Sequence, residues 1–368
     1  MKILRVTYPV LIFAALTCGV SAQQVNVTVP ATVDIFLKQL ARSEHQGMES
    51  SFVGGNIGAH ALNGNPAGLS LIHDDRFSLY TARFPRTIAV VSHQNETERY
   101  EDYGEYDLYA SGVELLNYAA PIRSIGIIGF DFARGHDGQF SRVDYLGKAT
   151  NNFPQSDWAL GVGFSRNLFA GLAFGVDAKW LRSKIQLPEN EEHAGHGYAY
   201  SLGLSQKIGE QLRIGGVVRN LSNGLSFSDD TIPDQIEQDV LVGGVYYQRH
   251  RDLDLKLSLD ANPPFKNGVR ASLGAEIWYM GRIGCRIGYL RHTEHRWQPV
   301  QIIRSETLQM EERIWKTEGP TFGIGFNLGR VRISGAYTPQ AKPTAKDGER
   351  IRVDQGGVAY YFSIGQGS

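Results

Sequence analysis

Residues 253–260 read Leu-Asp-Leu-Lys-Leu-Ser-Leu-Asp, so that every apolar residue is followed by a polar one. The alternation recurs over residues 269–277, Val-Arg-Ala-Ser-Leu-Gly-Ala-Glu-Ile, and over residues 283–289, Ile-Gly-Cys-Arg-Ile-Gly-Tyr. Successive side chains of a β-strand point to opposite faces, so a period of two collects the apolar side chains on one face. Most of the chain from about Ser156 onward has this pattern, which predicts an all-β protein.

Two all-β architectures fit this alternation: a soluble sandwich, and a transmembrane barrel with a polar lumen. The polar face distinguishes them, because it mixes charged residues with glycines such as Gly161, Gly163 and Gly203. Glycine gives a sandwich core no side chain to pack, but it makes room inside a barrel that holds a plug. The sequence therefore favours a transmembrane β-barrel.

The N-terminus indicates export. Lys2 and Arg5 precede an apolar run at 10–16, and Val20-Ser21-Ala22 places small residues before a cleavage site. This layout predicts a signal peptide at 1–22, and the run is too short to span a bilayer. Cleavage leaves 35 Lys and Arg (37 − 2) against 38 acidic residues, a net charge of −3, so we expect no nucleic-acid partner.

Short and long connections alternate along the chain. Short links are expected at Pro121, 167–169, 208–210, 250–251, 280–281 and 328–329, and long ones at 94–106, 133–155, 183–195, 221–237, 261–268, 291–318 and 339–353. Tight periplasmic turns and longer external loops are typical of outer-membrane barrels. Seven long links joining strand pairs give about fourteen antiparallel strands, provided that 76–93 is one long first strand bent at Pro85. The barrel is expected over 76–364, followed by a tail at 365–368.

Residues 31–72 do not alternate: 33–41 has helical spacing, and 54–71 is rich in glycine and small residues. Three motifs occur here in order, Gln46-Gly47-Met48, Phe52-Val53-Gly54-Gly55 and Asn65-Pro66-Ala67-Gly68-Leu69. This arrangement resembles the N-terminal signature of the FadL-type outer-membrane superfamily, and it is most similar to the PorV/PorQ branch. The resemblance implies that 23–75 forms a plug, or hatch, inside the barrel, with Asn65, Pro66, Ala67 and Gly68 as its gating residues.

The expected strand register assigns a set of polar side chains to the lumen. They are Asp177, Lys179, Arg213, Arg219, Asp254, Lys256, Asp260, Arg270, Glu276, Arg282 and Arg286. So many charges argue against a continuous apolar channel and favour ion pairs that hold the plug. The long link 291–318 contains Trp297, Ile302, Ile303 and Trp315, and exposed apolar residues in a long loop indicate a partner.

Two functions follow from the resemblance. A PorV/PorQ-type protein would assist protein secretion or surface attachment by binding cargo or secretion-system proteins, as in type IX secretion. A FadL-type channel would instead take up hydrophobic small molecules past the hatch. On sequence we favour the first function and keep the second as the alternative, with outer-membrane lipid as the surroundings in both.

Motifs for chemistry are missing from the sequence. Gly323-Ile324-Gly325 is not followed by a helical pattern and does not have dinucleotide-binding spacing, and no nucleophile elbow occurs. The pairs His193/His196 and His292/His295 have no neighbouring cysteine or well-placed carboxylate to complete a metal site. We therefore expect no enzymatic activity, no cofactor and no metal.

Overall fold

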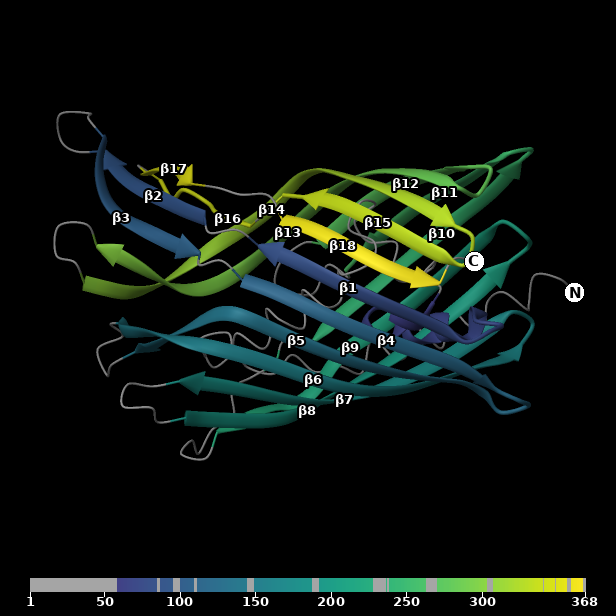
Figure 1. Cartoon of the computed structure of the whole chain (residues 1–368). Helices are drawn as coiled ribbons and strands as arrows, with labels where there is room; N and C mark the ends of the chain where they lie inside the picture. Colours follow the sequence, from purple (N-terminus) through teal and green to yellow (C-terminus); the bar gives the residue numbers. More distant parts are fainter. Residues whose placement is uncertain are drawn as a thin grey trace, which may run out of the picture.

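The computed structural model of the chain describes residues 58–84, 87–94, 100–108, 111–143, 149–186, 192–227, 236, 238–262, 270–302, 307–339, 341–347, 349–355 and 359–366 (Figure 1). The expected signal peptide and the helical spacing at 33–41 lie outside these residues. None of the described helices has both the length and the apolar character needed to cross a membrane.

Fourteen antiparallel strands close into a barrel, which confirms the predicted fold class. The barrel strands are β1 (Arg76–Phe84), β4 (Ser111–Ile122), β5 (Gly126–Val143), β6 (Ala149–Phe169), β7 (Leu172–Gln186), β8 (Glu192–Ile208), β9 (Leu212–Phe227), β10 (Asp239–His250), β11 (Leu253–Ala261), β12 (Arg270–Tyr279), β13 (Ile283–Ile302), β14 (Thr307–Leu328), β15 (Val331–Thr338) and β18 (Ala359–Gln366). Each pairs with the next, and β1 closes the ring by pairing with both β4 and β18. Because β18 continues to Gln366, the first two residues of the expected tail, 365 and 366, are part of the barrel.

The two ends of the barrel differ in their connections. At the end where β18 stops, tight turns pass through residues with positive φ, among them Ala170, Gly209, Met280 and Gly329 (Figure 1). Such φ values match turns that join twisted antiparallel strands closely. At the other end, the described strands stop within or beside the residues predicted as long links. The predicted extents 133–155 and 291–318 are wrong, however, because β5 and β6, and likewise β13 and β14, stay paired through most of these residues.

The outward face of the barrel is apolar and the inward face is polar. Along β12, Leu273 and Ile277 point outward and are 59% and 47% exposed, whereas Glu276 points inward and is 7% exposed. Exposed leucine, isoleucine, phenylalanine and tyrosine side chains recur on the outward face of the other barrel strands. A soluble protein rarely exposes so large an apolar surface, while a lipid-facing barrel requires one.

The first strand does not stay in the barrel along its whole predicted length. β1 ends at Phe84, just before Pro85, and β2 (Thr87–Gln94) pairs with β3 (Tyr100–Leu108) and β17 (Glu349–Gln355). β3 in turn meets the tip of β13, and β16 (Lys342–Pro343) pairs with β14. These segments form an external lobe at the long-link end (Figure 1). The predicted bend at Pro85 thus marks the point where the chain leaves the barrel.

The external lobe has its own apolar core. Ala89, Val91, Val300 and Trp315 are buried together, and Ile302 packs against them. Trp315 and Ile302 were expected to be exposed for a partner, and this expectation is wrong because both close the lobe. The side chain of Trp297, on β13, is not described, and Ile303 lies outside the described residues.

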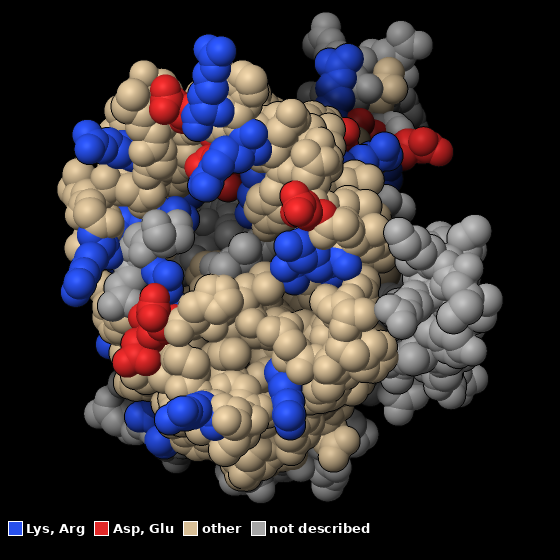
Figure 2. All heavy atoms as spheres, turned by 90° about the vertical axis from the view of Figure 1, so that its right-hand side faces the viewer, with Lys and Arg blue, Asp and Glu red and all other residues tan. Residues whose placement is uncertain are grey.

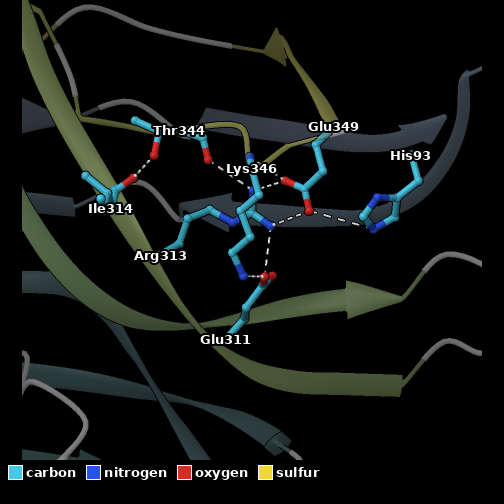
Figure 3. Close-up of polar contacts among 7 residues, drawn as sticks. All are labelled: His93, Glu311, Arg313, Ile314, Thr344, Lys346 and Glu349. Atoms are coloured by element: carbon cyan, nitrogen blue, oxygen red, sulfur yellow. Dashed lines mark hydrogen bonds and ion pairs between the residues drawn. The ribbon is translucent and has the colours of Figure 1, made fainter.

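A buried arginine organises the polar side of this lobe (Figure 3). Arg313 pairs with both carboxylate oxygens of Glu349 and lies 2.9 Å from Glu311. It also donates to the carbonyl of Thr344 at 3.1 Å. Burial alone would raise the pKa of Glu349, but its hydrogen bonds to Arg313 and to the Lys346 backbone lower that pKa below its usual value. These contacts tie β17 to β14.

The first prediction concerns this ion cluster. Arg313→Met should remove the cation that binds both oxygens of the buried Glu349, which keeps the Lys346 amide and His93 as partners; the cost should reach at most about 3–5 kcal/mol, and hydrogen exchange in β17 should speed up. Lys346→Met, which removes an exposed partner of Glu311, should change exchange little. Since the pKa of Glu349 is lowered in the fold, its stabilisation should persist at neutral pH and fade as the pH falls through the folded pKa. Equal exchange in both variants would contradict the assignment.

The second prediction concerns which side chains of β11 point outward and which point into the lumen. Leu257 is exposed on the outward face, whereas Lys256 points inward with a side chain 13% exposed. In a Cys285→Ser background, a lipid-soluble thiol reagent should label Leu257→Cys and spare Lys256→Cys. Leu257→Arg should cost about 2–4 kcal/mol if the residue lies at the membrane midplane. Labelling of position 256 in preference to 257 would show that the register is wrong.

Candidate functional site: the hatch in its cradle

The hatch segment, residues 58–72, lies inside the barrel as two short 3-10 turns, η1 (Ala59–Asn63) and η2 (Pro66–Leu71). Asn65 caps η2, because its Oδ1 accepts a hydrogen bond from the Ala67 amide at 3.1 Å. Pro66 occupies the first position of the turn, where its fixed φ fits and its missing N–H is not needed. Pro66, Ala67 and Gly68 are all buried. The Asn-Pro-Ala-Gly motif therefore forms a compact buried turn.

Glycines on consecutive strands make the cradle that receives this turn. A Cβ at Gly163 would lie 2.1 Å from the Leu62 side chain, and one at Gly203 would lie 2.0 Å from Asn65 Oδ1. A Cβ at Gly175 would lie 2.3 Å from the backbone at Pro66 and Ala67. These positions on β6, β7 and β8 face inward. A side chain at Gly175 would collide with hatch backbone, whereas one at Gly163 or Gly203 would require Leu62 or Asn65 to move.

Polar side chains of the wall hold the hatch backbone. Lys179 donates to the Leu62 carbonyl and Arg219 to the Asn63 carbonyl, both at 3.2 Å. Ser165 donates to the Ala67 carbonyl at 3.2 Å, and the Asn65 amide donates to the Leu204 carbonyl at 3.0 Å. Backbone groups buried away from water need such partners. The hatch is thus held by contacts from four different strands, β6 to β9.

Lys179 also balances two buried carboxylates. Its Nζ lies 3.3 Å from Asp131 and 3.5 Å from Asp177, and all three side chains are nearly inaccessible to water. The Asp131 side chain fits against Gly161, where a Cβ would lie 1.7 Å from its Oδ1. This cluster lies directly behind the hatch and fixes the cation that binds the Leu62 carbonyl.

The other expected lumen residues form separate groups along the wall. Glu276 accepts from Arg286 and Trp278, with Lys256 3.8 Å away, while Asp239 pairs with Arg219 and Arg270. Asp260 is buried on β11, and Arg213 is partly buried on β9. Asp254 pairs with Arg249 at the short-turn end, where Arg282 is exposed. Viewed from that end, Lys and Arg side chains surround the mouth (Figure 2).

An apolar cluster, which we call the apolar chamber, lies on the long-link side of the hatch. Its buried members are Tyr80, Ala82, Val113, Leu115, Ala133, Ala159, Leu181, Ala199, Leu225 and Ile236. Leu115 lies two residues beyond Asn117, which bonds to Asn63 of the hatch, and Leu181 lies two residues beyond Lys179. A step of two along a strand stays on the same face. The inward face therefore changes from polar to apolar directly outside the hatch.

This chamber is the feature that the sequence interpretation missed. Around Trp180-Leu181 and Leu115-Leu116, consecutive apolar residues interrupt the alternation. Such doublets indicate that both faces of the strand are apolar at that depth. The charged residues on either side of these doublets therefore do not represent the entire lumen.

The fold has counterparts among solved structures. The Pseudomonas putida toluene transporter TodX superposes with a TM-score of 0.52 at 14% identity, covering 88% of this chain and 96% of TodX. The CymD monoaromatic hydrocarbon channel gives 0.52 at 12% identity, covering 89% and 97%. A Pseudomonas aeruginosa FadL homologue gives 0.51 at 11% identity, with the same coverage of 89% and 97%.

No protein-family model matches the sequence, and no curated protein resembles it significantly. At such low identities, the structural likeness concerns the course of the chain and not the ligand. The chain has the fold of the FadL-type outer-membrane barrels.

Proposed function

We propose that this chain is an outer-membrane channel for small hydrophobic molecules, with the hatch segment as its gate. The apolar chamber carries the proposal, because it offers an apolar lumen next to an element held by a limited set of hydrogen bonds. The apolar outward face supports placement in a membrane. The toluene and hydrocarbon specificities named for TodX and CymD agree with this class of ligand.

The charged lumen residues do not oppose this function. Lys179 is neutralised by Asp131 and Asp177, and Glu276 by Arg286 and Lys256. These charges are neutralised by one another or bound to the hatch backbone, and the Lys179 cluster lies beside the apolar chamber without being part of it. A hydrophobic ligand that has passed the buried polar residues Gln155, Asp157 and Ser183 would therefore meet the apolar chamber before the hatch.

The secretion role implied by the PorV/PorQ resemblance has less support. It depended on exposed apolar residues in 291–318, and Trp315 and Ile302 instead pack inside the external lobe. The structural likenesses to channels also favour uptake. Secretion of cargo proteins by a strain that lacks this chain is therefore expected to be normal.

The third prediction tests the gate. Gly175→Ala should push the hatch out of its cradle, because the new Cβ would collide with hatch backbone rather than with a flexible side chain. Uptake of labelled toluene by cells that carry only this channel should rise several-fold. The matched control is Gly244→Ala on β10, whose Cβ would find only ordinary contacts, the nearest at 3.4 Å.

Heat-modifiable gel mobility should show that both glycine variants form intact barrels. Unchanged uptake by Gly175→Ala, with the barrel intact and hydrogen exchange in the hatch accelerated, would mean that the hatch does not gate passage.

The fourth prediction tests the chamber. Leu181→Asn places an amide among apolar side chains, which should weaken entry of a hydrophobic ligand and lower toluene uptake several-fold. The control is Leu241→Asn, an equally buried leucine that packs with Val217 outside the chamber. If the two variants take up toluene equally at equal barrel content, the chamber does not lie on the path of the ligand.

A further inference from the structure

A row of charged and aromatic side chains crosses the outward face of β4 to β8. Direct cross-strand pairs join Glu114 to Arg134, Arg134 to Trp158, Trp158 to Arg182 and Arg182 to His196. The neighbouring inward residues on these strands, such as Ala133, Ala159 and Leu181, are buried in the chamber. The row therefore points away from the lumen, toward the surroundings of the barrel.

This row marks the outer limit of the apolar band. One step toward the short-turn end, the outward pairs are Leu116 with Phe132, Phe132 with Leu160 and Leu160 with Trp180. Aromatic residues favour the level of lipid headgroups, and charged residues lie beyond it. Given the proposed placement in the membrane, the row lies at the headgroups on the long-link side.

The charge of this surface is predominantly positive. Among the residues of this surface whose side chains the structure describes, Arg83, Arg134, Arg182 and Lys184 are the four cations and Glu114 is the acidic residue. Glu114 is engaged already, with Arg83 at 3.9 Å and His136 at 3.7 Å. The surplus is 4 − 1 = +3, on a chain whose formal net charge is −1. On β13 and β14, by contrast, the outward Arg291 lies opposite Glu318.

Trp158 organises the centre of the row. The Arg134 guanidinium lies 5.2 Å from its ring centroid, and Phe132 packs on it with ring centroids 5.5 Å apart. Stacking orients a guanidinium and leaves its N–H groups available to a phosphate oxygen. Arg134 and Arg182 thus flank one aromatic platform.

An apolar groove continues from this platform along the outward face. It has a volume of about 370 Å³, and its apolar lining comprises Leu116, Tyr118, Phe130, Phe132, Leu160 and Val162. A cationic rim above an apolar groove matches an amphiphile with an anionic headgroup and an acyl chain. Neither a free anion nor a soluble acidic protein would use both parts.

We propose that the outward face of β4 to β6, with Arg182 of β7, binds a phosphorylated, acylated lipid of the outer leaflet. Arg134 and Arg182 hold its phosphate, and the groove between Leu116 and Val162 holds an acyl chain. The inference rests on the proposed outer-membrane placement but not on the gating role of the hatch. Such a lipid would fasten the half of the barrel that carries the hatch cradle.

The test uses the full-length protein in detergent and diphosphoryl lipid A as the probe, with binding followed by native mass spectrometry. At about 1 kcal/mol for each basic residue near an anionic lipid, Arg134→Gln with Arg182→Gln should weaken binding about 30-fold. The double Arg→Lys variant should keep most of the affinity, since charge is retained. The control Arg166→Gln removes an exposed arginine from the opposite end of β6 and should leave binding unchanged.

Competitors identify the ligand. Dephosphorylated lipid A should bind poorly, and inorganic phosphate should not displace the diphosphoryl form, because it lacks the acyl chains. Toluene uptake by the Gln double variant should stay near that of the wild type, which separates this proposal from the channel function. Equal lipid A binding by the Gln double variant and Arg166→Gln, with both barrels intact, would overturn the proposal, as would displacement by inorganic phosphate alone.

Discussion

The hydrogen-bond ladder that joins β1 to β18 is the constraint on which the remaining structure depends. Without it the sheet would expose two edges, which a membrane cannot tolerate because it offers backbone groups no water. With the ring closed, every barrel strand has one face toward the outside of the barrel and one toward the lumen. Leucine and isoleucine can then cover the outside while Lys, Arg, Asp and Glu remain in the interior.

Closure of the ring also leaves an interior that the hatch occupies. A ring of fourteen strands is wide enough to hold more than wall side chains. Glycines at 163, 175 and 203 let the hatch backbone approach the wall, and Lys179 and Arg219 satisfy its carbonyls. On the same wall, the apolar chamber lies two residues further along the strands toward the long-link end. The arrangement places a cluster of buried apolar side chains against the hatch, which is the basis of the proposed gate.

Much of this architecture could be predicted from the sequence, because the strict alternation at 253–260 indicates which face of the strand each side chain lies on. The strand number followed from the alternation of short and long links. The prediction of one strand over 76–93 was wrong, because the chain leaves the barrel at Pro85 and β2 pairs in the external lobe. The length of the β13–β14 hairpin could not be predicted in this way. Beyond the apolar band, alternating polar residues can pair as strands as readily as they can form loops. Burial of Trp315 was likewise hidden, because its neighbours Ala89 and Val91 come from the far end of the chain. Individual lumen charges were found, but their grouping around Lys179 and Glu276 depends on cross-strand register.

The central claim is that the hatch segment must leave its cradle for a hydrophobic molecule to pass. Leu62→Cys with Gly163→Cys, in the Cys285→Ser background, would tether the hatch where the Leu62 side chain now touches the wall. Toluene flux into liposomes containing this variant should be measured oxidised and then reduced. The account predicts that flux is abolished by the disulfide and returns on reduction, whereas equal flux in both states, with the cross-link confirmed by mass, would contradict it.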